Sequence, residues 1–303
     1  MATGSKKAVL AAMGANLGIA IAKFGGAAYT GSSAMLAEGV HSLVDTGNQL
    51  LLLFGMKRSA RPADRKHPFG YSREIYFWSF VVAVLLFTAG GVVAIYEGVQ
   101  KLNAPHPVES PVVNYVILCL AMVMEGGSFR VALGEFRKVT GNTSWWRAVR
   151  EAKDPVLFTV LFEDTAALIG LAVALAGLVA AHLFNLPALD GVASLLIGLI
   201  LIAASLLLAR ETMSLIIGES ASPALLARLE HHLLREPVIV EVRDMSSVHL
   251  GPHDIVVTAL VDFRDTVPAG EIERIVGRLI AEIRAVEPDV KRLFLAPTSF
   301  AGG

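Results

Sequence analysis

The sequence predicts a mainly α-helical membrane protein in which six transmembrane helices are followed by a small αββαβ domain. Three observations support this fold class: long apolar runs fill the first two thirds of the chain, basic residues cluster at alternate ends of these runs, and the last third has the composition of a soluble domain. Only 17% of the 303 residues are charged, against about a quarter in soluble globular proteins. We therefore expect a transmembrane domain over residues 1–217 and a soluble domain over 218–303.

Six apolar segments are long enough to cross a bilayer as helices, which takes about 20 residues each. They cover residues 8–28, 33–56, 75–98, 112–133, 156–182 and 188–215. The connections at 29–33, 103–111 and 184–187 contain no lysine or arginine, whereas basic residues cluster at the opposite ends. By the positive-inside rule the basic ends face the cytoplasm, and an even number of spans places both termini there.

Overall charge and cysteine content exclude several classes of function. The formal net charge of −1 does not favour a nucleic-acid partner. The single cysteine, Cys119, excludes an internal disulfide and a cysteine-based metal site. Because the first apolar segment is too long for a signal peptide and no transit peptide is visible, the expected location is a cell inner (plasma) membrane.

Ionisable residues lie deep in two of the apolar segments, where each charge costs about 2.5–3.5 kcal/mol. His41 and Asp45 are four residues apart in the second segment, so they share one helical face at depths of about 12 and 18 Å. Asp164 in the fifth segment lies at a depth of about 13 Å, next to Glu163. One imidazole with several carboxylates is a ligand set for Zn²⁺ or its first-row neighbours. The alternative is that His41 and Asp45 only hydrogen-bond each other.

Glu125 in the fourth segment lies nearer the cytoplasmic side. It is a candidate metal ligand or proton relay, and the alternative is an ion pair with Arg130. With no lysine or arginine counted among these intramembrane groups, three carboxylates and one histidine are expected to need a cation. A membrane hydrolase is disfavoured, because neither His-Glu-x-x-His nor Gly-x-Ser-x-Gly occurs.

Three segments resemble the cation diffusion facilitator family of divalent metal transporters. They are Tyr-Thr-Gly-Ser-Ser-Ala-Met-Leu-Ala-Glu-Gly-Val-His-Ser-Leu-Val-Asp at 29–45, His-Pro-Phe-Gly-Tyr-Ser-Arg-Glu at 67–74 and Ile-Ile-Gly-Glu at 216–219. The resemblance covers nearly the whole chain. It implies six helices, a homodimer, a cytoplasmic αββαβ domain like a metallochaperone, and exchange of metal for protons.

The chain departs from the common family pattern in the fifth segment. Many members have His-x-x-x-Asp there, but alignment on Asp164 places Val160 at the histidine position. Glu163-Asp164 instead resembles the branch that includes a mitochondrial zinc transporter. Because Glu163 projects about 100° from Asp164 on a helix, its contribution to metal binding or proton transfer is left open.

Two further sites follow from the resemblance. Asp64 and His67 match two positions of a zinc site in the loop after the second span, but the third position matches Tyr71, a poor ligand. We treat this as a weak site, with a solvated turn as the alternative. Arg73 and Glu219 match the region of a charge pair that joins the dimer in relatives.

The C-terminal residues predict the order αββαβ. Helices are expected over 225–234 and 268–286, and strands over 238–248, 255–263 and 292–296, with a turn at Gly251-Pro252. Positions that bind zinc in relatives align with Arg243, Ala259 and Leu295, none of which is a ligand. Pairs such as His231-His232 on an exposed helix are typically solvated, so this domain is expected to dimerise without a metal cluster.

Together these features predict a proton-coupled efflux transporter for divalent metal ions, with zinc as substrate, no cofactor and no enzymatic activity. Its expected partners are a second copy of the chain, metal ions, protons and the lipid bilayer. A carboxylate-rich site leaves open a manganese, iron or cobalt transporter of the same family. The missing fifth-segment histidine also leaves open a non-transporting membrane metal receptor or scaffold.

Overall fold

A computed structural model describes residues 2–30, 33–104, 111–141 and 153–298. These residues form two compact units, one made of Met1–Ala60 and Glu74–Met213, the other of Arg61–Arg73 and Ser214–Gly303. The loop after the second helix thus groups with the C-terminal residues, whereas the sequence suggested only a boundary near residue 218.

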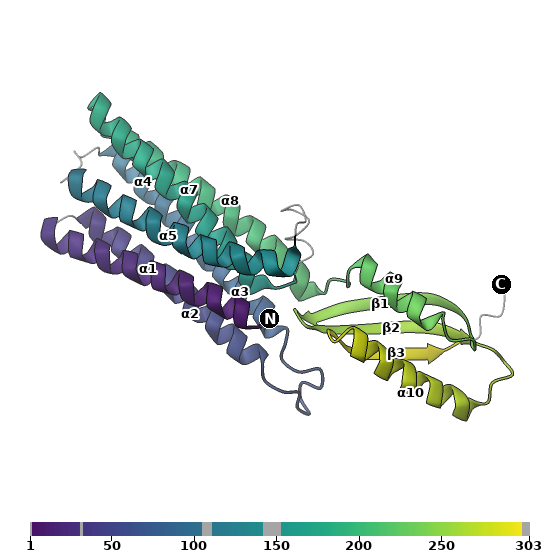
Figure 1. Ribbon diagram of the computed structural model, residues 1–303. Coiled ribbons are helices and arrows are strands. Elements are labelled where there is room, and N and C mark those ends of the chain that lie inside the picture. The colour runs from purple at the N-terminus through teal and green to yellow at the C-terminus, as the bar shows by residue number, and fades with distance from the viewer. Residues whose placement is uncertain (1, 31–32, 105–110, 142–152, 299–303) are drawn as a thin grey trace. The chain divides into compact units, whose positions relative to one another are not determined.

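The first unit is a bundle of long helices (Figure 1). In chain order these are α1 (Ala2–Thr30), α2 (Ser33–Ser59), α3 (Glu74–Leu85), η1 (Leu86–Val92), α4 (Val93–Asn103), α5 (Pro111–Thr140), α7 (Pro155–Phe184) and α8 (Ala188–Ile217). Helix α1 packs against α2 and α5, and α5 packs against α7. Most of the helix ends lie two to seven residues beyond the predicted ends. The hydrophobic pattern locates the apolar middle of a helix better than its terminal turns.

Five segments within the described part of the chain are long and apolar enough to cross a membrane. They are Gly4–Tyr29, Glu74–Asn103, Val112–Lys138, Pro155–Phe184 and Ala188–Ile217. Helix α2 has 27 residues, which is enough to cross. Its polar residues, including Glu38, His41 and Asp45, lower its hydropathy below that of the other five. Two of the candidate ligands, His41 and Asp45, are thus among the residues that make α2 polar.

The third predicted span is not a uniform α-helix. A seven-residue π-helix, η1, interrupts it between α3 and α4 and contains the pair Gly90-Gly91. Such widened turns are rare and occur often at functional sites. The hydrophobic pattern of this span predicted only a continuous helix.

Capping residues set the bounds of α7. The Asp154 carboxylate accepts hydrogen bonds from the backbone N–H groups of Val156 and Leu157, and Pro155 occupies the first helical position. Ser5 of α1 donates a hydrogen bond to the same carboxylate. At the other end, Asn185 adopts a left-handed conformation with φ 54° and ends the helix. The acidic residues of α7 are thus carried on a helix whose start is tied to α1.

Glycines bring the backbones of α4 and α8 close together. A Cβ on Gly98 would lie 2.8 Å from the backbone N of Leu195, and one on Gly198 would lie 2.9 Å from the backbone N of Ile95. Backbone atoms cannot move aside as a flexible side chain can. Both positions therefore require glycine for this helix contact.

The second unit contains α9 (Pro223–Leu233), β1 (Ile239–Gly251), β2 (Asp254–Phe263), α10 (Ala269–Val286) and β3 (Val290–Pro297). Its order αββαβ is the predicted one. Strand β2 is central, antiparallel to β1 and parallel to β3. Pro268 is the cap residue before α10 rather than a residue of its first turn as predicted.

Both helices of this unit cover one face of the sheet (Figure 1). Alternate β2 residues Val257, Ala259 and Val261 point into a core that also contains Leu229 of α9 and Leu279 of α10. The loop 61–73 joins the unit through hydrogen bonds and an aromatic contact: Ser72 Oγ donates to Asp254 at 3.1 Å, and the Arg292 guanidinium lies over the Phe69 ring.

The close α4–α8 contact predicts that adding a methyl group at a contact glycine destabilises the bundle, whereas adding one at an open glycine does not. Gly198→Ala should destabilise the bundle by about 1–3 kcal/mol, because the new Cβ meets backbone atoms. Gly134→Ala on α5 is the matched control, since nothing lies within 4 Å of its added Cβ, and a helical Gly→Ala change in open space is favourable. Thermal unfolding in detergent should show a lower midpoint for the first variant alone. Equal midpoints would contradict the close approach.

Candidate metal site in the helix bundle

His41 and Asp45 lie on one face of α2, as their spacing predicts. The His41 Nε2 atom is 3.8 Å from Asp45 Oδ2, and both side chains are partly buried, with exposed fractions of 34% and 20%. This separation is longer than a hydrogen bond. The pair is therefore open enough for another group to approach both side chains.

Asp164 of α7 is buried and makes one short hydrogen bond. The Ser128 hydroxyl of α5 donates to Asp164 Oδ2 at 2.7 Å, while the buried Oδ1 atom accepts no hydrogen bond. A buried carboxylate oxygen without a partner is costly. A proton or a metal ion bound there would remove that cost.

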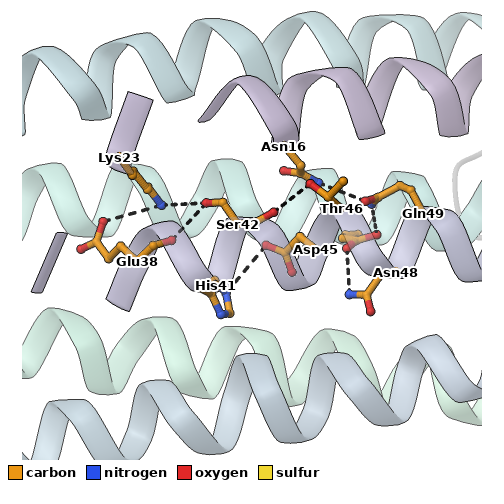
Figure 2. A network of polar contacts seen from close by, with 10 residues as sticks. Asn16, Lys23, Glu38, His41, Ser42, Asp45, Thr46, Asn48 and Gln49 are labelled. Atoms are coloured by element: carbon orange, nitrogen blue, oxygen red, sulfur yellow. Dashed lines mark hydrogen bonds and ion pairs between the residues drawn. The ribbon is translucent and has the colours of Figure 1, made fainter. Parts of the chain in front are cut away.

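Glu163, the neighbour of Asp164, is held by amides of α2. Gln49 Nε2 donates to Glu163 Oε2 at 2.9 Å, and Asn48 Nδ2 lies 3.4 Å from Oε1. Asn16 of α1 donates in turn to Gln49 Oε1 at 3.4 Å, and Figure 2 shows these amides on the same stretch of α2 as the separate His41–Asp45 pair. Both oxygens of Glu163 thus join α7 to α2. In this conformation Glu163 acts as a helix clamp.

Glu125 of α5 lies inside the same acidic region. Its side chain is buried, with the residue only 5% exposed, and its electrostatic neighbours are Asp164, Asp45 and Lys23. Arg130 is exposed at the helix surface. The alternative in which Arg130 neutralises Glu125 is therefore not the arrangement of this structure.

The candidate ligands do not converge into a finished metal site. Within the described ranges, no group of three or more His, Cys, Asp or Glu side chains is arranged to hold a metal ion. His41 and Asp45 come from α2, whereas Asp164 comes from α7. Bringing them to ligand distance of about 2 Å around one ion requires these side chains, or the two helices that carry them, to move.

The π-helix η1 borders the imidazole of His41. A Cβ on Gly90 would lie 3.8 Å from His41 Cε1 and 3.4 Å from Leu201 Cδ1 of α8. The absence of a side chain at this position leaves room beside the ring. The Gly90-Gly91 pair was the sequence signal for this feature, and the prediction of a uniform span missed it.

Two charged residues near the site, Lys23 and Glu38, were not among the predicted site residues. Lys23 lies within the predicted first span, so the assumption that the spans hold no lysine or arginine was wrong. Its Nζ atom is 3.6 Å from Glu38 Oε2 and donates to Ser42 Oγ at 3.1 Å (Figure 2). The signal was present, because Lys23 lies in the middle of an apolar run. The prediction did not consider that this long side chain could reach an acid of α2.

The loop residues Asp64 and His67 are brought together, but within a closed polar turn. Asp64 accepts hydrogen bonds from the Tyr71 hydroxyl at 2.6 Å and from the backbone N–H of His67 at 2.7 Å. The Tyr71 hydrogen bond, followed by that of His67, lowers the pKa of Asp64. His67 Nδ1 lies 3.5 Å from Asp64 Oδ1. The Tyr71 hydroxyl is thus hydrogen-bonded to the carboxylate that a metal ion in this loop would need as a ligand.

Arg73 lies beside Gly218, the residue before Glu219, within the second unit. A Cβ on Gly218, the neighbour of Glu219, would lie 3.7 Å from Arg73 Nη2. The Glu219 carbonyl accepts a hydrogen bond from the His249 N–H.

A bidentate ion pair in the bundle was not predicted from the sequence. Arg58 at the end of α2 donates two hydrogen bonds to Glu74 of α3, at 2.8 and 3.0 Å.

Histidines of the C-terminal domain are paired with single acids. His253 Nδ1 lies 3.2 Å from Asp289 Oδ1, and His232 Nε2 lies 3.3 Å from Glu282 Oε2. His249 is buried and its Nδ1 lies 3.3 Å from the Gly251 carbonyl. The His232 contact joins α9 to α10, the His249 contact lies within β1, and each of the three is explained without a metal ion.

Comparison with known proteins identifies relatives of the helix bundle. Residues 9–217 match the family model of the cation efflux transmembrane domain. The protein named "Proton-coupled zinc antiporter SLC30A9, mitochondrial" is 35% identical over 237 residues in Xenopus laevis and 34% identical in Homo sapiens. Each alignment covers 78% of this chain and 42% of the relative.

A plant relative extends the similarity. "Metal tolerance protein C4" of Arabidopsis thaliana is 31% identical over 265 residues, or 86% of this chain and 57% of that protein. The chain thus spans about half the length of these relatives or less. Since the family model covers well over half of the chain, and its bundle carries His41, Asp45 and Asp164 in the interior, the chain belongs to the cation efflux family, also called the cation diffusion facilitators.

Proposed function

We propose that the protein is a proton-coupled efflux transporter for divalent metal cations, with zinc as its substrate. One observation carries the proposal: the bundle of a cation efflux family member places the imidazole of His41 in the same region as the carboxylates of Asp45, Glu125 and Asp164. Burying several carboxylates in a helix bundle is unfavourable without a cation or protons. The family is one of transporters, so a transport role is favoured over an enzymatic one, and no cofactor is needed.

In this proposal His41, Asp45 and Asp164 bind the metal ion. A neutral imidazole nitrogen and two carboxylates suit zinc, and a fourth ligand completes a tetrahedron. Glu125 is a further buried carboxylate that interacts with Asp45 and Asp164, and it serves as a ligand or as a proton acceptor. The same acids would also accept manganese, iron or cobalt, so zinc is favoured here by the imidazole and by the zinc antiporter relatives.

Proton coupling follows from the chemistry of the ligands. Metal binds neutral His41 and ionised Asp45 and Asp164, so protons compete with metal for the same groups. Alternating access then requires α2 and α7 to separate and rejoin as the site faces either side of the membrane. The clamp between Glu163 and the amides Asn48 and Gln49 is a contact that such a movement would remake.

The chain spans a membrane several times, and we propose that it does so in a cell inner (plasma) membrane with both termini in the cytoplasm. The basic ends of the helices support this orientation. The names of the antiporter relatives place those proteins in mitochondria. Fractionation of cells that express a tagged full chain decides between the two membranes.

We also propose that the protein is a homodimer. The face of the sheet opposite the helices exposes Leu260 and Phe294. They are diagonal neighbours on adjacent strands, because Phe294 pairs with Thr258, two residues before Leu260. An apolar sheet face of this kind is suited to a second copy. In the same proposal, Arg73 and Glu219 contribute to the dimer contact.

Transport into proteoliposomes tests the function directly. The full chain should take up Zn²⁺ faster than Mn²⁺, Co²⁺ or Fe²⁺, and an inwardly directed zinc flux should be driven by a proton gradient of opposite sense. Asp45→Ala should lower zinc uptake at least about tenfold, because it removes a charged ligand. Asp244→Ala in the C-terminal domain is the matched control. Zinc binding without transport of any metal would instead favour a receptor or scaffold.

The two acids of α7 should respond differently to neutral replacement. Glu163→Gln keeps a carbonyl that accepts from Gln49, so zinc affinity should fall by no more than about threefold. Asp164→Asn should weaken zinc binding by about tenfold or more, since a ligand charge is lost. Competition with a zinc-binding dye in detergent measures both. A larger loss for Glu163→Gln would make Glu163 a direct ligand.

A further inference from the structure

Lys23 is the buried cation of the acidic region. Its residue is 8% exposed, although it lies in the first span. The ammonium contacts Glu38 and Ser42 of α2, and its charge also acts on Asp45 and Glu125. An intramembrane lysine costs several kcal/mol unless it has such partners. Its position therefore depends on the acids around it.

Glu38 lies on the stripe of α2 that carries the candidate ligands. It precedes His41 by three residues and Asp45 by seven, which are one and two helical turns. Along the axis, Glu38 is about 10 Å from Asp45, toward the end where α2 begins. Its side chain is 51% exposed. Glu38 is thus the next carboxylate on this stripe, and the bundle itself leaves half of its side chain uncovered.

The contact between Lys23 and Glu38 is loose enough to exchange. The Nζ–Oε2 distance of 3.6 Å exceeds that of a strong charge-assisted hydrogen bond, about 2.7–2.9 Å. Lys23 keeps a second partner in Ser42 Oγ at 3.1 Å. If Glu38 turned away to bind another cation, the ammonium would retain that hydrogen bond.

We propose that Lys23 and Glu38 form an exchangeable ion pair that serves as the next step of the metal path beyond His41 and Asp45. Lys23 neutralises Glu38 while the metal is held deeper in the bundle. A divalent ion that moves toward the α1–α2 turn replaces the ammonium at Glu38, and the ammonium then repels the ion onward. The inference rests on the proposed transport function and makes Lys23 a positioning residue, because it acts through Glu38.

The test uses the purified full chain and zinc as the probe. Affinity is measured by dye competition in detergent, and release by stopped-flow chelation. Lys23→Gln should bind zinc at least about tenfold more tightly and release it more slowly, since the unit charge that is removed repels a divalent ion at an effective dielectric constant of about 20. Lys23→Arg, which keeps the charge, should stay within about twofold of the parent protein.

A double variant separates this role from simple helix packing. Lys23→Gln combined with Glu38→Gln removes both charges and should return zinc affinity and release to within about threefold of the parent. Glu38→Gln alone leaves the ammonium without its carboxylate and should weaken zinc binding by at least about tenfold. This single change also provides the test if Lys23→Gln does not fold.

Unchanged zinc affinity and release in all these variants, with only a lower unfolding midpoint, would overturn the proposal and leave a clamp between α1 and α2. Failure of the transport function has a different signature. In that case the parent chain would bind zinc without moving it into proteoliposomes, while the charge pair would still shift affinity as described.

Discussion

The cost of placing carboxylates inside an apolar helix bundle determines the arrangement around α2 and α7. Both acids of α7 have specific hydrogen-bond donors: Glu163 has the amides of Asn48 and Gln49, and Asp164 has the Ser128 hydroxyl. These neighbours come from α2 and α5, so the acids of α7 fix how three helices pack. Asp164 Oδ1 is the exception, since it is buried without a hydrogen bond. The residual cost is concentrated at the group that we propose to bind metal.

The same constraint distinguishes acids whose oxygens are all hydrogen-bonded from acids that keep an unpaired oxygen. A carboxylate with both oxygens hydrogen-bonded is satisfied without a ligand, and Glu163 is in that state. The pair His41–Asp45 is 3.8 Å apart and Asp164 keeps one free oxygen, so these groups gain most from a cation. Adjacent residues on one helix therefore have different hydrogen-bond partners, because a rotation of about 100° per residue directs Glu163 to the amides of α2 and Asp164 to Ser128.

Much of the fold could be predicted from the sequence, because its signals are local. Apolar runs located the long helices, alternation located β1 and β2, and a spacing of four placed His41 beside Asp45. The helix partners of the acids could not be predicted, since Asn48 meets Glu163 across 115 positions of the chain. The π-helix was also missed, because its hydrophobic pattern matches that of an ordinary helix. Lys23 was overlooked for a different reason: one long polar side chain hardly changes the hydropathy of a 29-residue helix.

Charge balance connects these separate features. Lys23 places one positive charge beside a region with four buried or partly buried acids, Asp45, Glu125, Glu163 and Asp164. One ammonium cannot neutralise four carboxylates, so the region retains affinity for a divalent ion or for protons. If the ammonium were absent, the added negative charge would hold a metal ion more firmly and slow its release. A transport site needs affinity high enough to load and low enough to unload, and a fixed cation one helix away is a direct means of setting that balance.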